Sequence, residues 1–283
     1  MQQSFWQQTS TDAAARPAAV ESPLAERALV EAPLAEPPLV EPGVRINPRL
    51  KPELVLLGQQ QTPLIVIDDL VENLPQLLAY AAVQNFQQDR DSYYPGVRAL
   101  LPRTYVKAVL DALYPLLYQQ YQLAANLRLT PKDIYFSLIN QKPETLLPLQ
   151  RLPHFDTPSN YYFALLHYLA PEPHGGTGFF RHLPTGYERI DAANQQHYFA
   201  SAQQYLDKQG VPAAAYCDGT DGHYQLYQAV PYRQNRLVIY PGNLLHSSLV
   251  KPELDISSDA SSGRLTANIF IEFVPRPAKF AAK

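Results

Sequence analysis

The sequence predicts an α+β fold that is mainly β: a double-stranded β-helix, or jelly-roll/cupin-like barrel, with N-terminal covering helices. Three observations support this prediction. Apolar residues follow helical spacing within residues 75–113, whereas short alternating runs separated by turn residues fill the chain after residue 134. With 283 residues and 46% hydrophobic content, the chain can also bury one sizeable core, as single-domain barrels of this length do.

The first fifty residues differ in composition from the rest of the chain. Val20-Glu-Ser-Pro-Leu-Ala-Glu recurs as Val30-Glu-Ala-Pro-Leu-Ala-Glu, and Val40-Glu-Pro repeats its beginning. A segment rich in proline, alanine and glutamate buries too little apolar surface to build its own core. We therefore predict a disordered tail over residues 1–50 and one domain over residues 51–283. The repeated Pro-Leu pairs leave open whether the tail is a plain spacer or a docking segment for a partner.

Local patterns predict the first elements of the domain. Thr62-Pro-Leu-Ile-Val-Ile reads as a strand, and helices are expected from Pro75 through Phe86 and over Pro102–Leu113. Because proline removes a helical hydrogen bond, Pro115 is expected to kink or restart the second helix.

The later elements follow from alternation and from helix-ending signals. Strands resume at Ile134–Asn140 and alternate with turns. An insertion from Pro184 to Gly222 interrupts them and contains a predicted helix, Asn194–Lys208, closed by Gly210. Insertions between barrel strands are where such a scaffold carries substrate specificity.

The pattern His154-Phe155-Asp156 is the strongest chemical signal in the chain. On a strand, residues i and i+2 project from one face, so an imidazole nitrogen and a carboxylate oxygen converge on one ion. The best third ligand is His246, which follows an apolar strand and a Pro-Gly-Asn turn. Two histidines and one carboxylate form the facial triad of non-haem Fe(II) oxygenases. The spacing alone is common by chance, so the surrounding pattern has to support it.

Two segments supply that support. Pro171-Glu-Pro-His-Gly-Gly-Thr-Gly-Phe-Phe contains paired glycines that suit a tight reversal between antiparallel strands. After His246, alternation in Gly263-Arg-Leu-Thr-Ala-Asn-Ile-Phe-Ile places Arg264, Thr266 and Asn268 on one face of a strand. We expect Arg264 to share a sheet with the metal ligands, where its planar fork is suited to holding a carboxylate.

Together these motifs resemble the 2-oxoglutarate- and Fe(II)-dependent dioxygenases, and within them the prolyl-hydroxylase-like branch. The similarity covers about residues 55–275 and extends to an uncharacterised bacterial group through Tyr94-Pro-Gly-Val-Arg98, Gly-Gly-Thr-x-Phe and Gly-Arg-Leu-Thr. The resemblance implies a set of iron ligands, which are also the catalytic centre, and a set of 2-oxoglutarate contacts. These are His154, Asp156 and His246 for iron, and Arg264, Tyr168 and Asn268 for the cosubstrate.

The resemblance also implies the activity. The expected cofactors are Fe(II), 2-oxoglutarate as cosubstrate and O2, and the expected reaction is hydroxylation of a C–H bond in a small metabolite or a peptide or protein side chain. Asp156 disfavours halogenation, because the halogenases of this superfamily lack that carboxylate. Two alternatives stay open at this point: a cupin-type metal-dependent hydrolase or isomerase, and a non-catalytic barrel that acts as a binding module.

Composition narrows the class of partner. A net charge of −3 and a pI near 6.2 give no general attraction to nucleic acid or to anionic membranes, so neither is expected as a partner. No segment approaches 18 uninterrupted apolar residues, and the single Cys217 has no partner for an intramolecular disulfide. We therefore expect a cytoplasmic protein, where Fe(II) and 2-oxoglutarate are both available.

The histidines outside the triad carry weaker expectations. His167 has the opposite strand parity from its neighbour and should face away from the metal, and His174 lies in the glycine turn. His197 and His223 look like surface positions. For His182 two interpretations stay open: a structural role and contact with the substrate.

Two interpretations also stay open for one motif that lies before the metal-ligand pattern in the sequence. Tyr94-Pro-Gly-Val-Arg98 either is a surface turn or holds Arg98 against the site.

Overall fold

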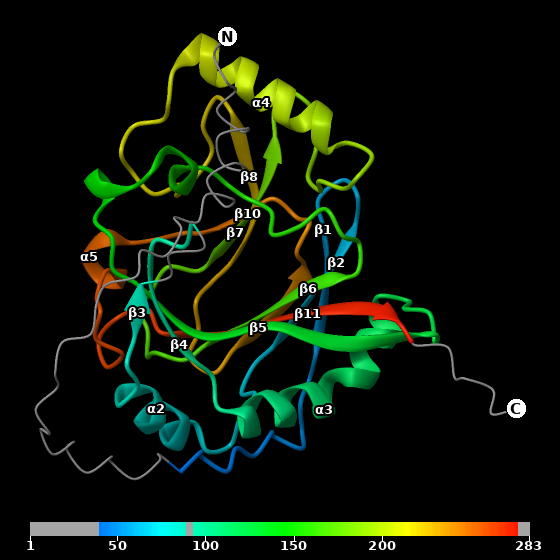
Figure 1. Cartoon of the computed structure of the whole chain (residues 1–283), viewed down its shortest axis with the longest axis vertical. Helices are drawn as coiled ribbons and strands as arrows, with labels where there is room; N and C mark the ends of the chain where they lie inside the picture. Colours follow the sequence, from blue (N-terminus) through cyan, green and yellow to red (C-terminus); the bar gives the residue numbers. More distant parts are fainter. Residues whose placement is uncertain (1–39, 89–92, 277–283) are drawn as a thin grey trace, which may run out of the picture.

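The computed structural model describes residues 40–88 and 93–276, and in this part of the chain two antiparallel sheets face each other (Figure 1). The larger sheet has eight strands in the order β1-β2-β9-β6-β11-β5-β4-β3, and the smaller has three in the order β10-β7-β8. The strands are β1 (Glu53–Leu57), β2 (Thr62–Ile67), β3 (Gln87–Gln88), β4 (Gly96–Leu100), β5 (Leu127–Ile139), β6 (Tyr162–Tyr168), β7 (Thr177–His182), β8 (Tyr224–Val230), β9 (Leu237–Pro241), β10 (His246–Ser248) and β11 (Thr266–Pro275).

From β5 onward the chain passes back and forth between the two sheets, except that β7 and β8 follow each other within the smaller one. β5, β6, β9 and β11 belong to the larger sheet, while β7, β8 and β10 belong to the smaller one. The segment at His154 joins the smaller sheet through an isolated antiparallel bridge to His246 at its β10 edge. This winding, one turn after another through two facing sheets, is a double-stranded β-helix, so the predicted fold class is confirmed.

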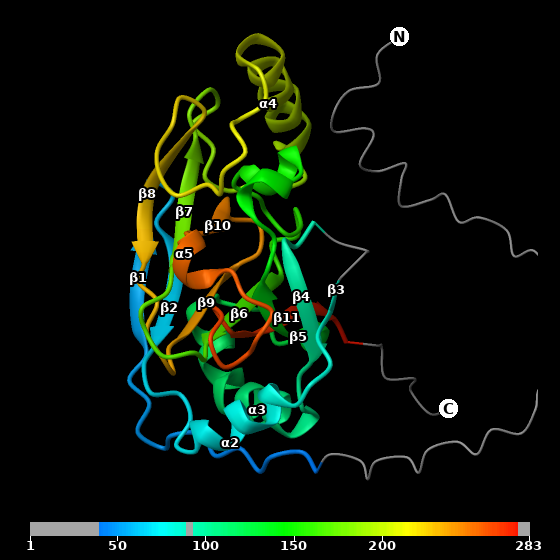
Figure 2. The ribbon, with the colours of Figure 1, turned by 90° about the vertical axis from the view of Figure 1, so that its left-hand side faces the viewer.

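Two helices cover one face of the larger sheet. α2 (Leu74–Ala82) and α3 (Arg103–Gln120) lie side by side beneath it in Figures 1 and 2. Their buried side chains, such as Leu77 and Leu113, join one core with Phe136 and Ile269 of the sheet. Burial of these apolar side chains away from water is the main stabilising contribution of the layer. The helices therefore hold the outer face of the sheet and leave its inner face to the site.

The remaining helices lie nearer the smaller sheet. α4 (Gln195–Gln209) falls in the predicted insertion and begins and ends within a residue of the predicted bounds. A one-turn helix, α5 (Pro252–Asp255), lies between β10 and β11. Two short 3-10 helices, η2 (Pro143–Thr145) and η3 (Pro148–Arg151), lead into the His154 segment. Within the described ranges, none of the helices combines the length and apolar character needed to cross a bilayer.

The packed structure begins ahead of the predicted boundary at residue 50. Ile46 forms an antiparallel bridge with Val71, and its side chain packs against the core. Farther upstream, the Glu41 carboxylate accepts hydrogen bonds from the backbone N–H groups of Arg103 and Thr104, at 3.0 and 2.9 Å. The packed part of the chain thus begins before residue 50. The two full repeats lie outside the described residues.

Two local expectations are corrected. Of the two outcomes expected at Pro115, a restart of the helix is wrong, because Pro115 lies inside the single helix α3. Pro115 and Asp111 are exposed, so water can solvate the carbonyl that loses its helical bond. Gly175 and Gly176 do not close a hairpin, since β6 and β7 belong to different sheets. The glycines instead allow close backbone approach: a Cβ on Gly175 would stand 1.8 Å from the Leu249 carbonyl oxygen.

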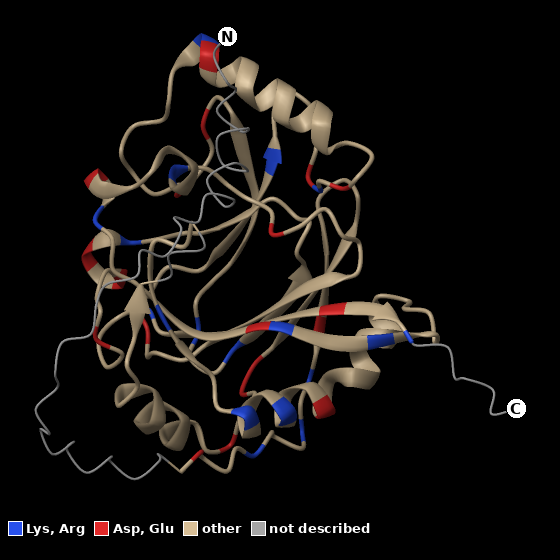
Figure 3. Cartoon of the chain, in the orientation of Figure 1, with Lys and Arg blue, Asp and Glu red and all other residues tan. Residues whose placement is uncertain are grey.

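Charged residues of both signs are interspersed along the chain (Figure 3). On α3, for example, Lys107 pairs with Asp111 one helical turn away.

Candidate metal centre

The three proposed metal ligands come from two neighbouring extended segments. His154 and His246 exchange backbone hydrogen bonds, with N to O distances of 2.9 and 2.8 Å, and the backbone N–H of Asp156 bonds to the Gly242 carbonyl at 2.7 Å. His154 was expected on a strand, but it makes only an isolated bridge. The expected geometry survives because any extended backbone sends residues i and i+2 to one side.

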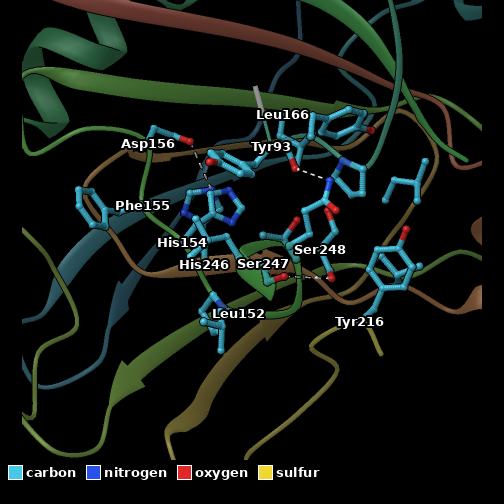
Figure 4. A pocket seen from close by; sticks show the side chains of 18 of the residues that line it. Tyr93, Leu152, His154, Phe155, Asp156, Leu166, Tyr216, His246, Ser247 and Ser248 are labelled. Atoms are coloured by element: carbon cyan, nitrogen blue, oxygen red, sulfur yellow. Dashed lines mark hydrogen bonds and ion pairs between the residues drawn. The ribbon is translucent and has the colours of Figure 1, made fainter. Parts of the chain in front are cut away.

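The side chains of His154, Asp156 and His246 converge in the cavity between the sheets (Figure 4). Each offers one ligand atom, and these atoms all lie within 4.8 Å of one another. The distance from His246 Nε2 to Asp156 Oδ1 is 3.8 Å, and the two imidazole centroids are 4.4 Å apart. The structure therefore brings together all three residues that the sequence singled out.

Burial shifts the pKa values of all three residues of this cluster. As whole residues His154 and Asp156 are exposed, although the Asp156 side chain is only 17% exposed, and His246 is buried. Burial, and then the neighbouring His246, lower the pKa of His154 to about 4. Burial likewise lowers the pKa of His246 to about 4 and raises the pKa of the Asp156 carboxyl to about 6. At neutral pH the site thus holds two neutral imidazoles and one carboxylate.

A hydrogen bond selects the tautomer of His246. Its Nδ1 lies 2.8 Å from the carbonyl oxygen of Leu244, so Nδ1–H donates to that oxygen. The lone pair on Nε2 then faces Asp156 and is available to a metal ion. Outer contacts of this kind orient metal-binding histidines in proteins, and the donor set of two imidazoles and one carboxylate suits Fe(II). The residues present therefore fit the expected metal.

Arg264 lies two residues before β11 of the larger sheet and lines the same cavity. The expectation that it shares a sheet with the metal ligands is therefore wrong, because His246 belongs to β10 of the smaller sheet. It is only 2% exposed. Its Nε donates to the Gly175 carbonyl at 2.7 Å and its Nη2 to the Gly176 carbonyl at 3.2 Å, which leaves Nη1 for other partners. The close backbone approach at the two glycines therefore holds the guanidinium in place.

A buried carboxylate supports that arrangement from the other side. Asp255 is fully buried and accepts hydrogen bonds from the backbone N–H of Gly175, at 3.1 and 3.2 Å to its two oxygens, and from that of Lys251 at 2.7 Å. His174 Nδ1 lies 2.9 Å from Asp255 Oδ1. Sequence reasoning missed Asp255, because it is separated from Gly175 by 80 residues and belongs to no local motif.

The other two expected cosubstrate residues differ from each other. Asn268 lines the cavity, and its Nδ2 donates to Ser137 Oγ at 2.7 Å. Tyr168 is fully buried and is not among the lining residues; its hydroxyl lies 2.7 Å from Thr177 Oγ1. Thr177 itself lines the cavity, so it stands between Tyr168 and the site. Sequence reasoning missed Thr177, because its contact with Tyr168 joins strands of two different sheets.

The cavity has a volume of about 560 Å³, and eight tyrosine and phenylalanine residues are among those that line it. This volume lies in the range of about 300–1,000 Å³ that is typical of small-ligand sites. The insertion contributes Tyr198, Phe199 and Tyr216, as expected for a specificity segment. Tyr216 faces the metal ligands from the opposite side in Figure 4.

Arg98 also lines the cavity. Its motif is no surface turn, since β4 begins at Gly96 and pairs with β5.

The other histidines lie outside this cavity. His167 faces away from the metal as expected and is buried between Tyr105 and Asn235. His223 is buried, not at the surface: its Nε2 lies 3.0 Å from His182 Nε2, and packing under α4 covers both rings. His182 therefore takes its structural reading, while His197 is exposed as expected.

Comparison with known proteins gives one family match. A family model described as "Family of unknown function (DUF6445)" matches residues 48–271. A search of curated proteins finds no match.

Three solved structures illustrate the likeness to known folds. HygX from Streptomyces hygroscopicus, solved with nickel, 2-oxoglutarate and hygromycin B, is 11% identical, with a TM-score of 0.42 over 77% of this chain and 87% of that one. The non-heme alpha-ketoglutarate-dependent epimerase SnoN is 13% identical, with a TM-score of 0.38 over 77% and 80%. A Pseudomonas putida prolyl-4-hydroxylase is 12% identical, with a TM-score of 0.34 over 81% and 93%. These likenesses are distant, so a functional assignment has to come from the geometry of the site.

Proposed function

The chain belongs to DUF6445, a family of unknown function, and we propose that it is a 2-oxoglutarate- and Fe(II)-dependent oxygenase. One observation carries the proposal: the ligand atoms of His154, Asp156 and His246 lie within 4.8 Å of one another in a cavity that also contains Arg264. Such a triad leaves three positions on an octahedral metal for other ligands. A buried guanidinium beside it supplies the charge that a dicarboxylate needs.

The residues of the site divide into two roles. His154, Asp156 and His246 hold Fe(II), and the Leu244 carbonyl keeps His246 in its binding tautomer. Arg264 binds the distal carboxylate of 2-oxoglutarate through the donors that Gly175 and Gly176 leave available.

Two hydroxyl and amide groups complete the cosubstrate site. We assign a hydrogen bond to 2-oxoglutarate to Thr177, whose hydroxyl Tyr168 orients at 2.7 Å, instead of to Tyr168 directly. Asn268, tied to Ser137, lies on the same inner face and contacts the bound cosubstrate.

Fe(II) with 2-oxoglutarate and O2 supplies the oxidation of a substrate C–H bond when bound in such a site. The aromatic walls exclude water from the reacting groups and position the substrate carbon. Hydroxylation is the proposed outcome, on a small metabolite or on one side chain of a peptide. The cavity admits a group of that size and no folded domain.

Anaerobic titration tests this proposal. Purified protein with Fe(II) should develop the visible charge-transfer band of a chelated keto acid when 2-oxoglutarate is added. Arg264→Met should keep its iron but bind 2-oxoglutarate at least about tenfold more weakly, because a carboxylate loses a charge-assisted partner. Normal 2-oxoglutarate affinity in Arg264→Met would remove Arg264 from the cosubstrate site.

Oxygen consumption separates this function from the alternatives. A cupin-type hydrolase or isomerase would turn over without O2, and a binding module would form no succinate. Among the described residues, the metal-ligand cluster has three members, with no fourth histidine or glutamate of the kind those enzymes recruit. Slow succinate formation that requires both Fe(II) and O2, even before a substrate is known, is the expected result.

A further inference from the structure

Arg98 is the second arginine of the cavity, and the metal centre and the cosubstrate do not use it. It lies on β4, directly opposite Ser137 of β5, which is itself opposite Thr266 of β11. Directly opposed residues of neighbouring strands point to the same face of a sheet. Arg98 therefore shares the inner face with Arg264 and Asn268. With about 4.8 Å between neighbouring strands, it stands roughly 10 Å across the sheet from Thr266.

The backbone around Arg98 is closely held. A Cβ on Gly96 would stand 1.9 Å from the Leu138 carbonyl oxygen, so glycine allows β4 to approach β5 at that point. The Pro95 carbonyl accepts hydrogen bonds from the backbone N–H groups of Asn140 and Gln141, both at 3.3 Å. These contacts fix the backbone from which the Arg98 side chain projects.

Aromatic rings hold the guanidinium as well. Its Cζ lies 4.4 Å from the centroid of Tyr94 and 5.2 Å from that of Tyr135. Cation–π contacts of this kind keep the planar guanidinium oriented. Its N–H donors point outward in the plane of the guanidinium. Arg98 is half-buried, whereas Arg264 is almost completely buried. The two arginines thus differ in depth: Arg264 lies at the closed side and Arg98 at the accessible side.

Charge near the metal points to an anion as the ligand of Arg98. Asp156 is the one acidic side chain among the described residues that line the cavity, and the proposed metal uses it. Arg98 lines the same cavity as His154 and Asp156, so its charge acts on a group that binds between them. A group bound between Arg98 and the metal ligands therefore meets positive potential from both sides, and the rings around it favour an apolar body.

We propose that Arg98 binds a carboxylate of the primary substrate, so that the enzyme oxidises small, flat or apolar carboxylic acids or the carboxylate end of a peptide. This inference rests on the proposed oxygenase function. The planar fork of arginine matches a carboxylate in two parallel hydrogen bonds, which orients the substrate as well as binding it. The oxidised carbon is then one within reach of the metal while the carboxylate stays on Arg98.

Matched pairs of ligands test this assignment on the protein with Fe(II) and 2-oxoglutarate under anaerobic conditions. The probes are N-acetyl-L-phenylalanine, N-acetyl-L-proline and 3-phenylpropanoate, each paired with its primary amide, which has the same shape without the charge. Binding is followed by the change that each probe causes in the charge-transfer band. The variants are Arg98→Gln and Arg98→Lys, with Arg128→Gln as control because Arg128 is an exposed arginine at the far end of β5.

At least one acid should bind the wild type about 10–100-fold more tightly than its amide, as expected for a charge-assisted pair. That ratio should fall to near one in Arg98→Gln, stay intermediate in Arg98→Lys and be unchanged in Arg128→Gln. Three results would overturn the inference: no probe for which the acid is preferred, a preference that persists in Arg98→Gln, or loss of 2-oxoglutarate binding itself in that variant. Loss of 2-oxoglutarate binding in Arg98→Gln would assign Arg98 to the cosubstrate site and leave the proposed oxygenase function intact. A wild-type protein that forms no charge-transfer band would overturn both the oxygenase function and the role of Arg98.

Discussion

His154 and His246 are bound to each other through their backbones in both directions, with N to O distances of 2.9 and 2.8 Å. Two proposed metal ligands that are 92 positions apart in the sequence are thus held opposite each other by the backbone. The backbone bonds fix the separation of the two imidazoles, and Asp156 supplies the third ligand from the same extended segment. Such preorganisation reduces the cost of ordering the ligands when the metal binds.

Removing the carboxylate should therefore abolish metal binding without unfolding the protein. We expect Asp156→Ala to weaken Mn(II) or Fe(II) binding by more than about 100-fold, since even outer contacts of metal ligands are worth about 10–100-fold. Asp133→Ala is the control, because Asp133 is exposed and acts on Asp156 only through its charge. Metal content after gel filtration and a direct titration measure the effect. Stoichiometric metal in Asp156→Ala would show that the ion binds elsewhere.

Asp255 should be needed for cosubstrate binding, although it does not touch the cavity. Asp255→Asn loses a charged acceptor for the Gly175 N–H and loosens the carbonyls that hold Arg264. We expect a stability loss of about 1.5–3 kcal/mol, as for hydrogen bonds to charged groups, and several-fold weaker 2-oxoglutarate binding at normal metal content. Asp259→Asn, an exposed aspartate of the same connection, should change neither. If stability falls but 2-oxoglutarate affinity does not, Asp255 supports the fold alone.

The buried pair His182 and His223 should make the protein acid-sensitive. Burial lowers the pKa of His182 to about 3 and that of His223 to about 4, against an ordinary value of 6.5. Below pH 6.5 the unfolded chain therefore takes up protons that the folded chain does not, and stability falls as the pH drops toward 4. We expect this loss to be roughly 1–3 kcal/mol per histidine.

Denaturant unfolding between pH 7 and 4 measures that loss. His223→Gln should flatten the pH dependence, whatever its effect on stability at pH 7. The exposed His197 serves as the control, and His197→Gln should keep the slope of the wild type. An unchanged slope in His223→Gln would show that other groups cause the acid sensitivity.

The contact of Glu41 with α3 defines where the structural domain begins. Glu41→Ala should lower the free energy of unfolding by about 1 kcal/mol, because two N–H groups at the start of the helix lose their acceptor. The prediction that the repeats contribute no packing stays open, and a deletion of residues 1–39 tests it. We expect an unchanged melting temperature in that deletion and a lower one when residues 40–47 are removed as well. A large drop in the shorter deletion would place part of the repeats in the domain.

Much of the site could be predicted because it depends on short-range regularities of extended chains. The spacing of His154 and Asp156 requires only a locally extended backbone, and alternation alone places Arg264 and Asn268 on one face. Thr177 and Asp255 could not be found in this way. Their roles depend on which segments meet across the two sheets, and that is decided by the packing of the whole barrel.

The same distinction explains the errors. The paired glycines at Gly175 have the composition of a hairpin turn, but their small size serves close contact with Leu249 and room for Arg264. His223 follows a run of polar turn residues and has no apolar periodicity, so its burial under α4 left no local signal.

The placement of α4 has a consequence for how this family can diversify. Tyr198, Phe199 and Tyr216 all come from the single stretch between β7 and β8, while the metal ligands lie outside it. Exchanging that stretch needs the chain to be altered only between β7 and β8, and it would replace the part of the cavity wall that these residues form. The proposed metal ligands would stay untouched. A change of substrate, from one acid to another, would then require a new segment between β7 and β8 and no change at the proposed metal site.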